Sequence, residues 1–307
     1  MPAHSNNSRK QDRMPVSQNH LAALPSATPD IIAMASRDNP RILTIAHRGF
    51  WKNTAENSIA SIEAAITAGV EMVEIDTQAT ADGHLVVIHD ETLDRTTTGN
   101  GVVADLPFDT VRQARLKAGA GGPAAAITHE TVPTLEEVLE AARGRIAVNI
   151  DTKYERDLPA VMDTVLRLGI EAQVLVKTAI DVDATTFPLL KTHWFGRIPH
   201  MPMFRVRKDR FAEDLRRIAA LRPPMIEVKF DDIDDIAAAQ DELVRQNIRV
   251  WINTLDVSHC LDYSDSHALH DPHGVWSRLR QAGVGAIQTD EVEAFRAWAA
   301  QSKGDPA

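Results

Sequence analysis

The sequence contains a single cysteine, Cys260, and no run of about 20 apolar residues such as a membrane-spanning helix requires. One cysteine excludes an intramolecular disulfide framework, so cysteine usage does not indicate the redox compartment. The missing apolar run excludes a transmembrane helix. We therefore expect no integral association with a membrane.

An excess of basic residues is also missing. The chain has 33 lysines and arginines against 43 aspartates and glutamates, which gives a formal net charge of −10 at pH 7. Nucleic acids and anionic membranes are bound through a basic footprint, so neither is expected as the main partner. An acidic chain can still bind an anionic small molecule, provided that the pocket is locally positive. The sequence does not determine the oligomeric state, and a homo-oligomer is one of the alternatives.

The first part of the chain lacks the continuous apolar segment of a signal peptide, because Pro25 and Pro29 interrupt its short apolar pieces. We expect residues 1–38 to form a flexible leader, residues 39–300 a single domain, and residues 301–307 a short tail. Without a clear signal peptide, a cytoplasmic location is expected, with the periplasm as the alternative.

Short apolar segments alternate with helical patterns from residue 42 to residue 300. The pattern predicts strands at 42–46, 72–76, 146–150, 173–177, 198–204, 225–229, 248–252 and 285–288, and the prolines in 198–204 make that strand the weakest of the set. Eight strands alternating with helices over about 260 residues predict an α/β fold, the (β/α)₈ TIM barrel. A doubly wound open sheet would need a glycine-rich phosphate loop after its first strand, and His47-Arg48-Gly49 is not one.

A β-hairpin and a long loop are inserted after the second strand. Asp82-Gly83 predicts a two-residue hairpin turn, and counting back along both arms places Asp76 opposite His89. The following stretch, 95–130, is expected to be irregular, and so long an excursion is usually functional or covers a site. The hairpin would bring an imidazole next to the second strand.

Polar residues follow the predicted strands where the carboxyl ends of a barrel converge. Those after the first three strands, with the histidine returned by the hairpin, are His47, Arg48, Glu74, Asp76, His89, Asp151 and Lys153. Three carboxylates suit one hard divalent cation, Mg²⁺ or Ca²⁺, and two imidazoles suit acid–base catalysis near neutral pH. A cation together with an arginine and a lysine suits a phosphate group. Zinc is disfavoured, because the sequence has no His-x-His or His-Glu-x-x-His pair.

Each of these features also has a commonplace explanation. A histidine at a strand end is usually a packed residue, and Lys153 could simply pair with Asp151. Arg48 and Lys153 could also neutralise the carboxylates without a metal. The conjunction of these residues at one rim of one barrel is what favours chemistry.

Later strands contribute further candidates. Glu227 and Lys229 end the sixth strand, where Glu227 either lines the pocket or forms an ion pair with Lys229. Trp251, on the seventh strand, could belong to the barrel core. The loop 256–273 is rich in histidine and aspartate, which fits a solvated lid better than a second metal site.

Several of these segments carry a family resemblance. The matching pieces are His47-Arg48-Gly49, Ala55-Glu56-Asn57-Ser58, Glu74-Ile75-Asp76, Asp82-Gly83, His89 to Thr97, Pro133-Thr134-Leu135 and Gln288-Thr289-Asp290. The chain resembles the glycerophosphodiester phosphodiesterases, phospholipase-C-like enzymes on a TIM barrel. The resemblance implies that His47 and His89 are the catalytic acid and base. It implies that Glu74, Asp76 and Asp151 bind the metal, that Arg48 and Lys153 contact the phosphate, and that Trp251 stacks on the substrate.

The resemblance also implies a reaction, the hydrolysis of a glycerophosphodiester to glycerol 3-phosphate and an alcohol. The alternatives are the same chemistry on a lysophospholipid, a sphingomyelin-like lipid or a sugar phosphodiester, and a non-catalytic barrel that binds phosphorylated headgroups. Two positions depart from the family pattern: Asp151 stands where most relatives have glutamate, and Ala55 where they have proline.

Overall fold

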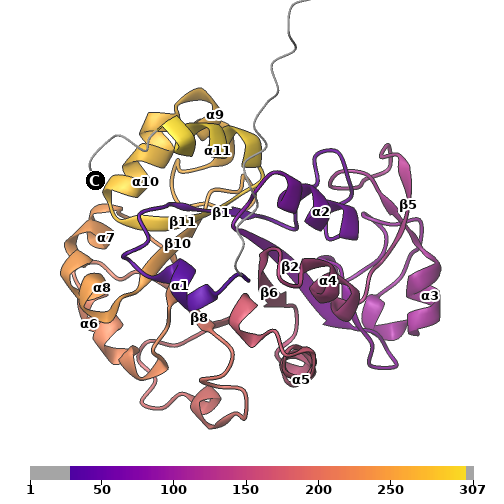
Figure 1. Cartoon of the computed structure of the whole chain (residues 1–307), viewed down its shortest axis with the longest axis horizontal. Coiled ribbons are helices and arrows are strands. Elements are labelled where there is room, and N and C mark those ends of the chain that lie inside the picture. Colours follow the sequence, from indigo (N-terminus) through magenta and orange to yellow (C-terminus); the bar gives the residue numbers. More distant parts are fainter. Residues whose placement is uncertain (1–27, 302–307) are drawn as a thin grey trace, which may run out of the picture.

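The computed structural model describes residues 28–301. Within this range eight parallel strands, in the order β1-β11-β10-β9-β8-β7-β6-β2, close into a barrel through the pairing of β1 with β2 (Figure 1). The predicted (β/α)₈ barrel is thus confirmed, the proline-interrupted strand included. The strands are β1 (Leu43–Ala46), β2 (Met72–Ala79), β6 (Ala147–Thr152), β7 (Val174–Ala179), β8 (His200–Arg205), β9 (Met225–Lys229), β10 (Arg249–Asn253) and β11 (Val284–Thr289).

Helices surround the barrel, and local signals in the sequence explain where several of them begin and end. The Ser58 hydroxyl accepts the N–H of Ser61 at the start of α2, Thr134 opens a capping box for α4, and Gly169 ends α5 in the left-handed conformation. None of the described helices is long and apolar enough to cross a membrane. The covering helices are α2 (Ile59–Thr67), α4 (Leu135–Ala142), α5 (Leu158–Leu168), α6 (Phe211–Arg217), α7 (Asp234–Ala238), α8 (Gln240–Gln246), α9 (Asp265–His270), α10 (Arg278–Gln281) and α11 (Val292–Gln301).

The inner face of the barrel changes from apolar to polar along each strand. Near the amino ends of the strands the inward side chains form a closed apolar core that includes Leu43, Met72 and Trp251. Two and four residues beyond Met72, the same face of β2 carries Glu74 and Asp76. The core therefore forms the floor of a polar site at the carboxyl ends of the strands, where barrels of this kind hold their functional residues.

A short helix, α1 (Ile31–Ala35), packs against the apolar core at the amino ends of the strands. Ile31 and Ala35 are buried in that core, and α1 lies in front of the barrel in Figure 1. Arg249, at the start of β10, holds the segment with hydrogen bonds to backbone carbonyls. Its Nε donates to Ala35 (3.1 Å), Nη1 to Arg41 (2.8 Å) and Gly285 (3.0 Å), and Nη2 to Ser36 (2.6 Å) and Asn39 (2.7 Å).

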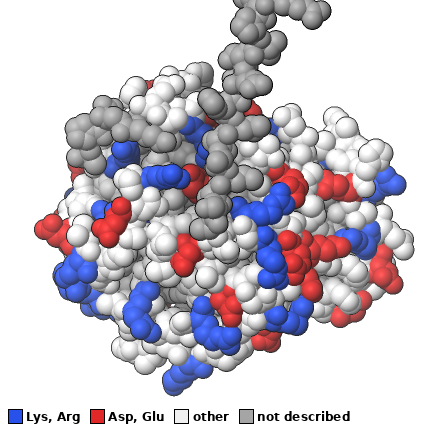
Figure 2. Space-filling view, in the orientation of Figure 1, with Lys and Arg blue, Asp and Glu red and all other residues white. Residues whose placement is uncertain are grey.

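The N-terminal boundary of the barrel domain is therefore earlier than expected. Residues 1–27 of the predicted leader lie outside the described residues, whereas residues 28–38 pack as part of the barrel. The short apolar piece around Ile31 is buried core, and a flexible leader does not extend to residue 38. Figure 2 shows basic and acidic side chains interspersed on the face that carries α1.

The predicted hairpin after β2 exists, but its register differs by one residue. The third strand, β3 (Leu85–Val87), pairs antiparallel with β2 so that Thr77 lies opposite Val87. The Thr80 hydroxyl accepts the N–H of His84 and closes a three-residue loop in place of the expected two-residue turn. Ile88, not His89, is therefore opposite Asp76, and its N–H donates to the Asp76 carbonyl.

Residues 95–130 are more ordered than the expected irregular loop. They contain a 3₁₀ turn (Val103–Asp105), α3 (Phe108–Gln113), β4 (Arg115–Lys117) and the start of β5 (Ile127–Thr131), which pairs with β4. With β3 they enclose a small apolar core that includes Leu93, Val111 and Leu116. The segment forms a lobe at the side of the barrel, on the right in Figure 1.

Candidate active site

Three carboxylates meet at the carboxyl ends of β2 and β6. Glu74 and Asp76 share the inner face of β2, and Asp151 is the register partner of Asp76 on β6. One carboxylate oxygen of each lies within 4.8 Å of the others, and Glu74 and Asp76 are buried. An all-oxygen donor set of this kind fits a hard divalent cation, so the residues that the sequence analysis selected are brought together.

The surroundings of the triad hold Glu74 and Asp76 in place and disfavour the negative charge of Glu74. Burial, together with the charge of Asp76, raises the pKa of Glu74 well above its ordinary value. The Asn57 side chain donates to Asp76 Oδ2 (2.8 Å) and accepts the Asp76 N–H (3.1 Å). The backbone N–H of Arg48 donates to Glu74 Oε2 (3.2 Å). A bound cation would favour the charged form of this preorganised cluster.

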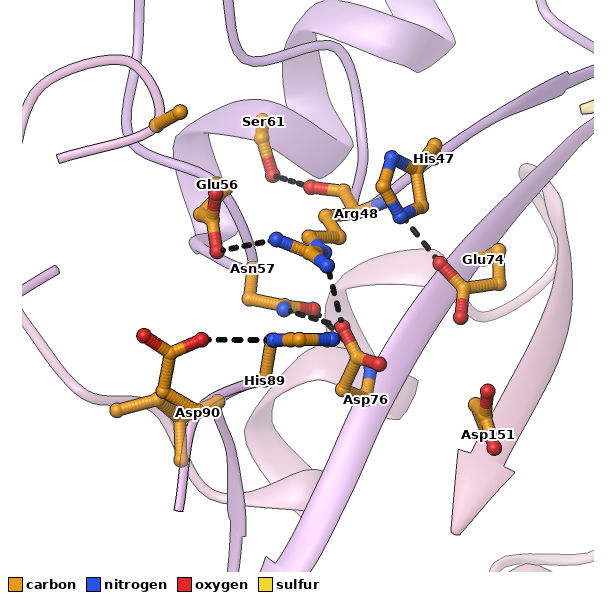
Figure 3. A network of polar contacts seen from close by, with 12 residues as sticks. His47, Arg48, Glu56, Asn57, Ser61, Glu74, Asp76, His89, Asp90 and Asp151 are labelled. Carbon is orange, nitrogen blue, oxygen red and sulfur yellow. Dashed lines mark hydrogen bonds and ion pairs between the residues drawn. The ribbon is translucent and has the colours of Figure 1, made fainter. Parts of the chain in front are cut away.

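Both candidate catalytic histidines are oriented by an aspartate. His47 Nδ1 lies 2.8 Å from Asp290 Oδ1, and His89 Nδ1 lies 2.7 Å from Asp90 Oδ1. An imidazole whose Nδ1–H is held by a carboxylate keeps its Nε2 for proton transfer. Figure 3 shows the His47 ring near Glu74 and the His89 ring near Asp76. His47 is buried, whereas His89 is more exposed.

A network of arginines and carboxylates connects Asp90, the partner of His89, to the carboxylate triad. Arg95 donates to Asp90 (2.7 Å) and to the buried Glu56 (2.8 Å), and Arg48 donates to the same Glu56 oxygen (3.0 Å). The Arg95 guanidinium holds the pKa of Asp90 well below its usual range. Arg48 Nε also lies 3.4 Å from Asp76 Oδ2, so Arg48 spans Glu56 and the triad (Figure 3).

The lysine nearest the triad is Lys177, which the sequence analysis missed. It lies on the inner face of β7 and is 6% exposed. Its Nζ is 3.0 Å from Asp151 Oδ2, 3.5 Å from Glu227 Oε2 and 3.8 Å from Glu74 Oε1. Burial alone would lower the pKa of Lys177, but the charges of Glu227 and Asp151 raise it well above its ordinary value. The sequence contained a signal for this residue: Lys177 stands in an apolar strand segment, and a lysine buried there usually has a charged partner.

The expected lysines lie further out. Lys153 follows the end of β6 and is exposed, and its backbone N–H, not its ammonium, makes the contact with β2. Lys229 is exposed at the end of β9. The ionic partner of Glu227 is Lys177, so the alternative of a Glu227–Lys229 pair was wrong about the lysine.

Trp251 belongs to the floor of the site. Its side chain is 0% exposed within the apolar core, which favours the core alternative over a surface that stacks on substrate. Its indole Nε1 donates to Asn253 Oδ1 (2.8 Å), and Asn253 Nδ2 donates to Glu227 Oε1 (3.0 Å). Trp251 therefore supports Glu227 through Asn253.

The 256–273 segment supports His47 indirectly, through Asp265 and Asp290. Asp265, on α9, accepts hydrogen bonds from the hydroxyls of Thr254 (2.6 Å) and Thr289 (2.7 Å) and from the N–H of Asp290 (2.8 Å). It thereby joins the ends of β10 and β11 and fixes the peptide whose side chain orients His47. The histidines of the segment do not form a second metal cluster, because within residues 28–301 the triad is the only such group.

Two family models match two separate parts of the chain. A model of the glycerophosphoryl diester phosphodiesterase family matches residues 47–182, the range that holds the triad, both histidines and Lys177. Over this range the chain is similar to the glycerophosphodiester phosphodiesterase family. Residues 200–299, which hold Glu227, Trp251 and Asp290, match a family model described only as a domain of unknown function.

Curated glycerophosphodiester phosphodiesterases match this segment of the chain over only part of their own length. The enzyme of that name from Caldanaerobacter subterraneus is 44% identical over 116 residues, 37% of this chain and 46% of the relative. The Bacillus altitudinis enzyme is 34% identical over 155 residues, 48% of this chain and 62% of the relative. The alignments thus span about half of the relatives' length.

Solved structures of glycerophosphodiester phosphodiesterases share the fold over most of the chain. The enzyme from Parabacteroides distasonis superposes with a TM-score of 0.72 at 24% identity and covers 92% of this chain and 95% of its own. A phosphodiesterase from Oleispira antarctica, solved with sn-glycerol-3-phosphate, gives a TM-score of 0.60 at 21% identity and covers 86% and 99%. These likenesses support the barrel.

Proposed function

We propose that the chain hydrolyses glycerophosphodiesters to glycerol 3-phosphate and an alcohol. The observation that carries this proposal is the pair of aspartate-oriented histidines beside a triad of carboxylates, two of which are buried. The relatives over residues 47–182 are named for the same activity, and a barrel of the same fold was solved with the expected product. Substrate and activity come from this combination, since the fold alone implies neither.

Two imidazoles supply the proton transfers. One of His47 and His89 accepts the proton of the attacking hydroxyl or water, and the other gives a proton to the leaving alcohol. Asp290 and Asp90 hold the two rings in place for this exchange. Because Nδ1 is occupied in each ring, Nε2 is the atom that transfers the proton.

Glu74, Asp76 and Asp151 would hold a divalent cation, Mg²⁺ or Ca²⁺. When bound, the cation would neutralise charge that develops on the phosphoryl oxygens. Asn57 fixes the Asp76 carboxylate, and the Arg48 peptide fixes Glu74, so the ligands are placed before any cation arrives. The nearby Arg48 guanidinium adds positive charge to the site.

The test is release of glycerol 3-phosphate from glycerophosphocholine by the full chain, with Mg²⁺ or Ca²⁺ and with a chelator. We expect turnover with metal and none with chelator. His47→Ala and His89→Ala should each lose at least about 100-fold in kcat and still bind the cation in calorimetry. His84→Ala, in the exposed hairpin loop, is the matched control and should keep full activity. A metal-bound chain inactive on every small diester would refute the proposal.

A lysophospholipid is the second candidate substrate, favoured by apolar side chains exposed after β10. The side chains of Val257, Leu261 and Leu269 are 83%, 54% and 50% exposed. They follow the carboxyl end of β10, the end of the barrel that carries the site. Lysophosphatidylcholine should therefore be assayed beside glycerophosphocholine. Faster turnover of the lipid, lost in Leu261→Ser, would establish it as the preferred substrate.

A further inference from the structure

Lys177 occupies the position beside Asp151 that the sequence pattern predicted for Lys153. Ile150 and Val176 are register partners on β6 and β7, so the next residues, Asp151 and Lys177, lie side by side on neighbouring strands. The ammonium contacts Asp151, Glu227 and Glu74 within 3.8 Å. A buried lysine is thus the cation that three carboxylates of the site share.

The charges at the site do not balance without additional cations. Four carboxylates converge there, those of Glu74, Asp76, Asp151 and Glu227, and the two basic side chains that contact them are Lys177 and Arg48. Two positive side chains against four ionised carboxylates leave a net charge of −2, which one divalent cation would neutralise. Once such a cation takes its share of the triad, the ammonium of Lys177 has N–H donors for another anion.

The other basic side chains are less suited to that anion. Arg48 is engaged by Glu56 and Asp76, and Lys153 is exposed beyond the end of β6. Lys177 is held from two sides, because Glu227 is fixed in turn by Asn253. A preorganised buried ammonium binds a phosphate oxygen more strongly than a mobile surface lysine does, because less freedom is lost on binding.

We propose that Lys177 binds the phosphate group of the substrate in this chain, in the role that the sequence pattern assigned to Lys153. This inference rests on the proposed function and names a residue of the same site. It assigns the basic contact to β7 in place of β6. Asp151, which stands where relatives carry glutamate, is the register neighbour of this lysine and its closest carboxylate partner.

The test compares Lys177→Met with Lys153→Met in the full chain. Calorimetry measures binding of Ca²⁺ alone, and then of glycerol 3-phosphate in saturating Ca²⁺. Loss of a charged hydrogen bond should weaken glycerol 3-phosphate binding by about 10- to 100-fold in Lys177→Met. Lys153→Met should stay within about 3-fold of the unmodified chain, and Ca²⁺ binding should not weaken in either variant.

A second variant guards against misfolding. Lys177→Met leaves Glu227 without its cation, so Lys177→Met/Glu227→Gln removes both charges and should fold while still losing glycerol 3-phosphate affinity. Equal losses in Lys177→Met and Lys153→Met, or a loss confined to Lys153→Met, would overturn the inference. Turnover by the unmodified chain is a separate readout: its absence refutes the proposed function, whereas turnover with an unaffected Lys177→Met refutes the inference alone.

Discussion

Replacing Arg249 with methionine should destabilise the barrel from its amino-terminal end. The guanidinium donates five hydrogen bonds to five carbonyl oxygens, four of them in residues 35–41. Burial lowers the pKa of Arg249 to about 10, so the side chain is still protonated at neutral pH. Methionine fills a similar volume but offers no donor.

The expected magnitude follows from two limits. Hydrogen bonds from a charged donor contribute about 1.5–3 kcal/mol each, but desolvation of the guanidinium offsets much of their sum. If the segment detaches instead, Ile31 and Ala35 leave the core, which costs about 3–4 kcal/mol for an isoleucine and an alanine. We therefore expect the free energy of unfolding to fall by about 3–5 kcal/mol. Arg249→Lys should fall in between, because an ammonium has only three donors.

Urea denaturation followed by tryptophan fluorescence measures this loss. Arg145→Met is the control, because Arg145 pairs with Glu63 on the surface and such a pair contributes at most about 1 kcal/mol. Trypsin should also cleave after Arg37 or Arg41 faster in the Arg249 variant, because the segment that holds these sites is released. If Arg249→Met were no less stable than Arg145→Met, the four hydrogen bonds to residues 35–41 would not hold the segment.

Three further predictions concern the lobe and the supports of the site. Arg95→Met removes the partner that depresses the pKa of Asp90. The stability from that shift is fully present above the unfolded pKa of about 4 and is lost only as the pH falls toward the much lower folded pKa. The difference in urea melts between the variant and the unmodified chain should therefore be constant from pH 7 to about pH 5 and shrink progressively below about pH 4. A gap independent of pH would contradict this. Gly121→Ala places a Cβ 2.4 Å from the Arg95 carbonyl oxygen at a φ of +75°, and should cost about 3 kcal/mol, whereas Gly119→Ala, at +64° with open space, should cost about 1–2 kcal/mol in the same thermal unfolding series. Asp265→Asn disturbs three hydrogen bonds at a buried position and should lower the free energy of unfolding by about 2–3 kcal/mol in urea; an unchanged midpoint would refute its role in joining the strand ends.

Much of the barrel could be predicted, because buried parallel strands and their helices leave strong local patterns. The strand from His200 to Arg205 was the least certain, since prolines interrupt it, yet it forms in the sheet. The hairpin register was misjudged because a side chain decided it. The Thr80 hydroxyl closes a three-residue loop, and a dipeptide rule for Asp82-Gly83 does not include that interaction.

The triad and the two histidines could be predicted from spacing and from the ends of strands. Most of their supports could not, because they are contacts between residues distant in the sequence; Asp90, which is adjacent to His89, is the exception. Asp290 lies 243 residues from His47, and Lys177 and Glu227 are 50 residues apart. Such partners become neighbours only through strand order and register. The sequence pattern favoured Lys153 over Lys177 because Lys153 stands two residues from Asp151. However, β6 ends at Thr152, so Lys153 lies beyond the sheet and is exposed to solvent.

The contact between His47 and Asp290 joins the first and last strands of the ring. β1 and β11 pair directly, and the two side chains meet at 2.8 Å where that seam reaches the mouth of the barrel. Under the proposed mechanism, turnover then reports ring closure, since an open or half-formed sheet separates a proton-transfer group from its orienting carboxylate. Two fragments of the chain, inactive alone, should recover activity on mixing at the rate at which the seam forms. The recovery of activity would then report when β1 and β11 come together.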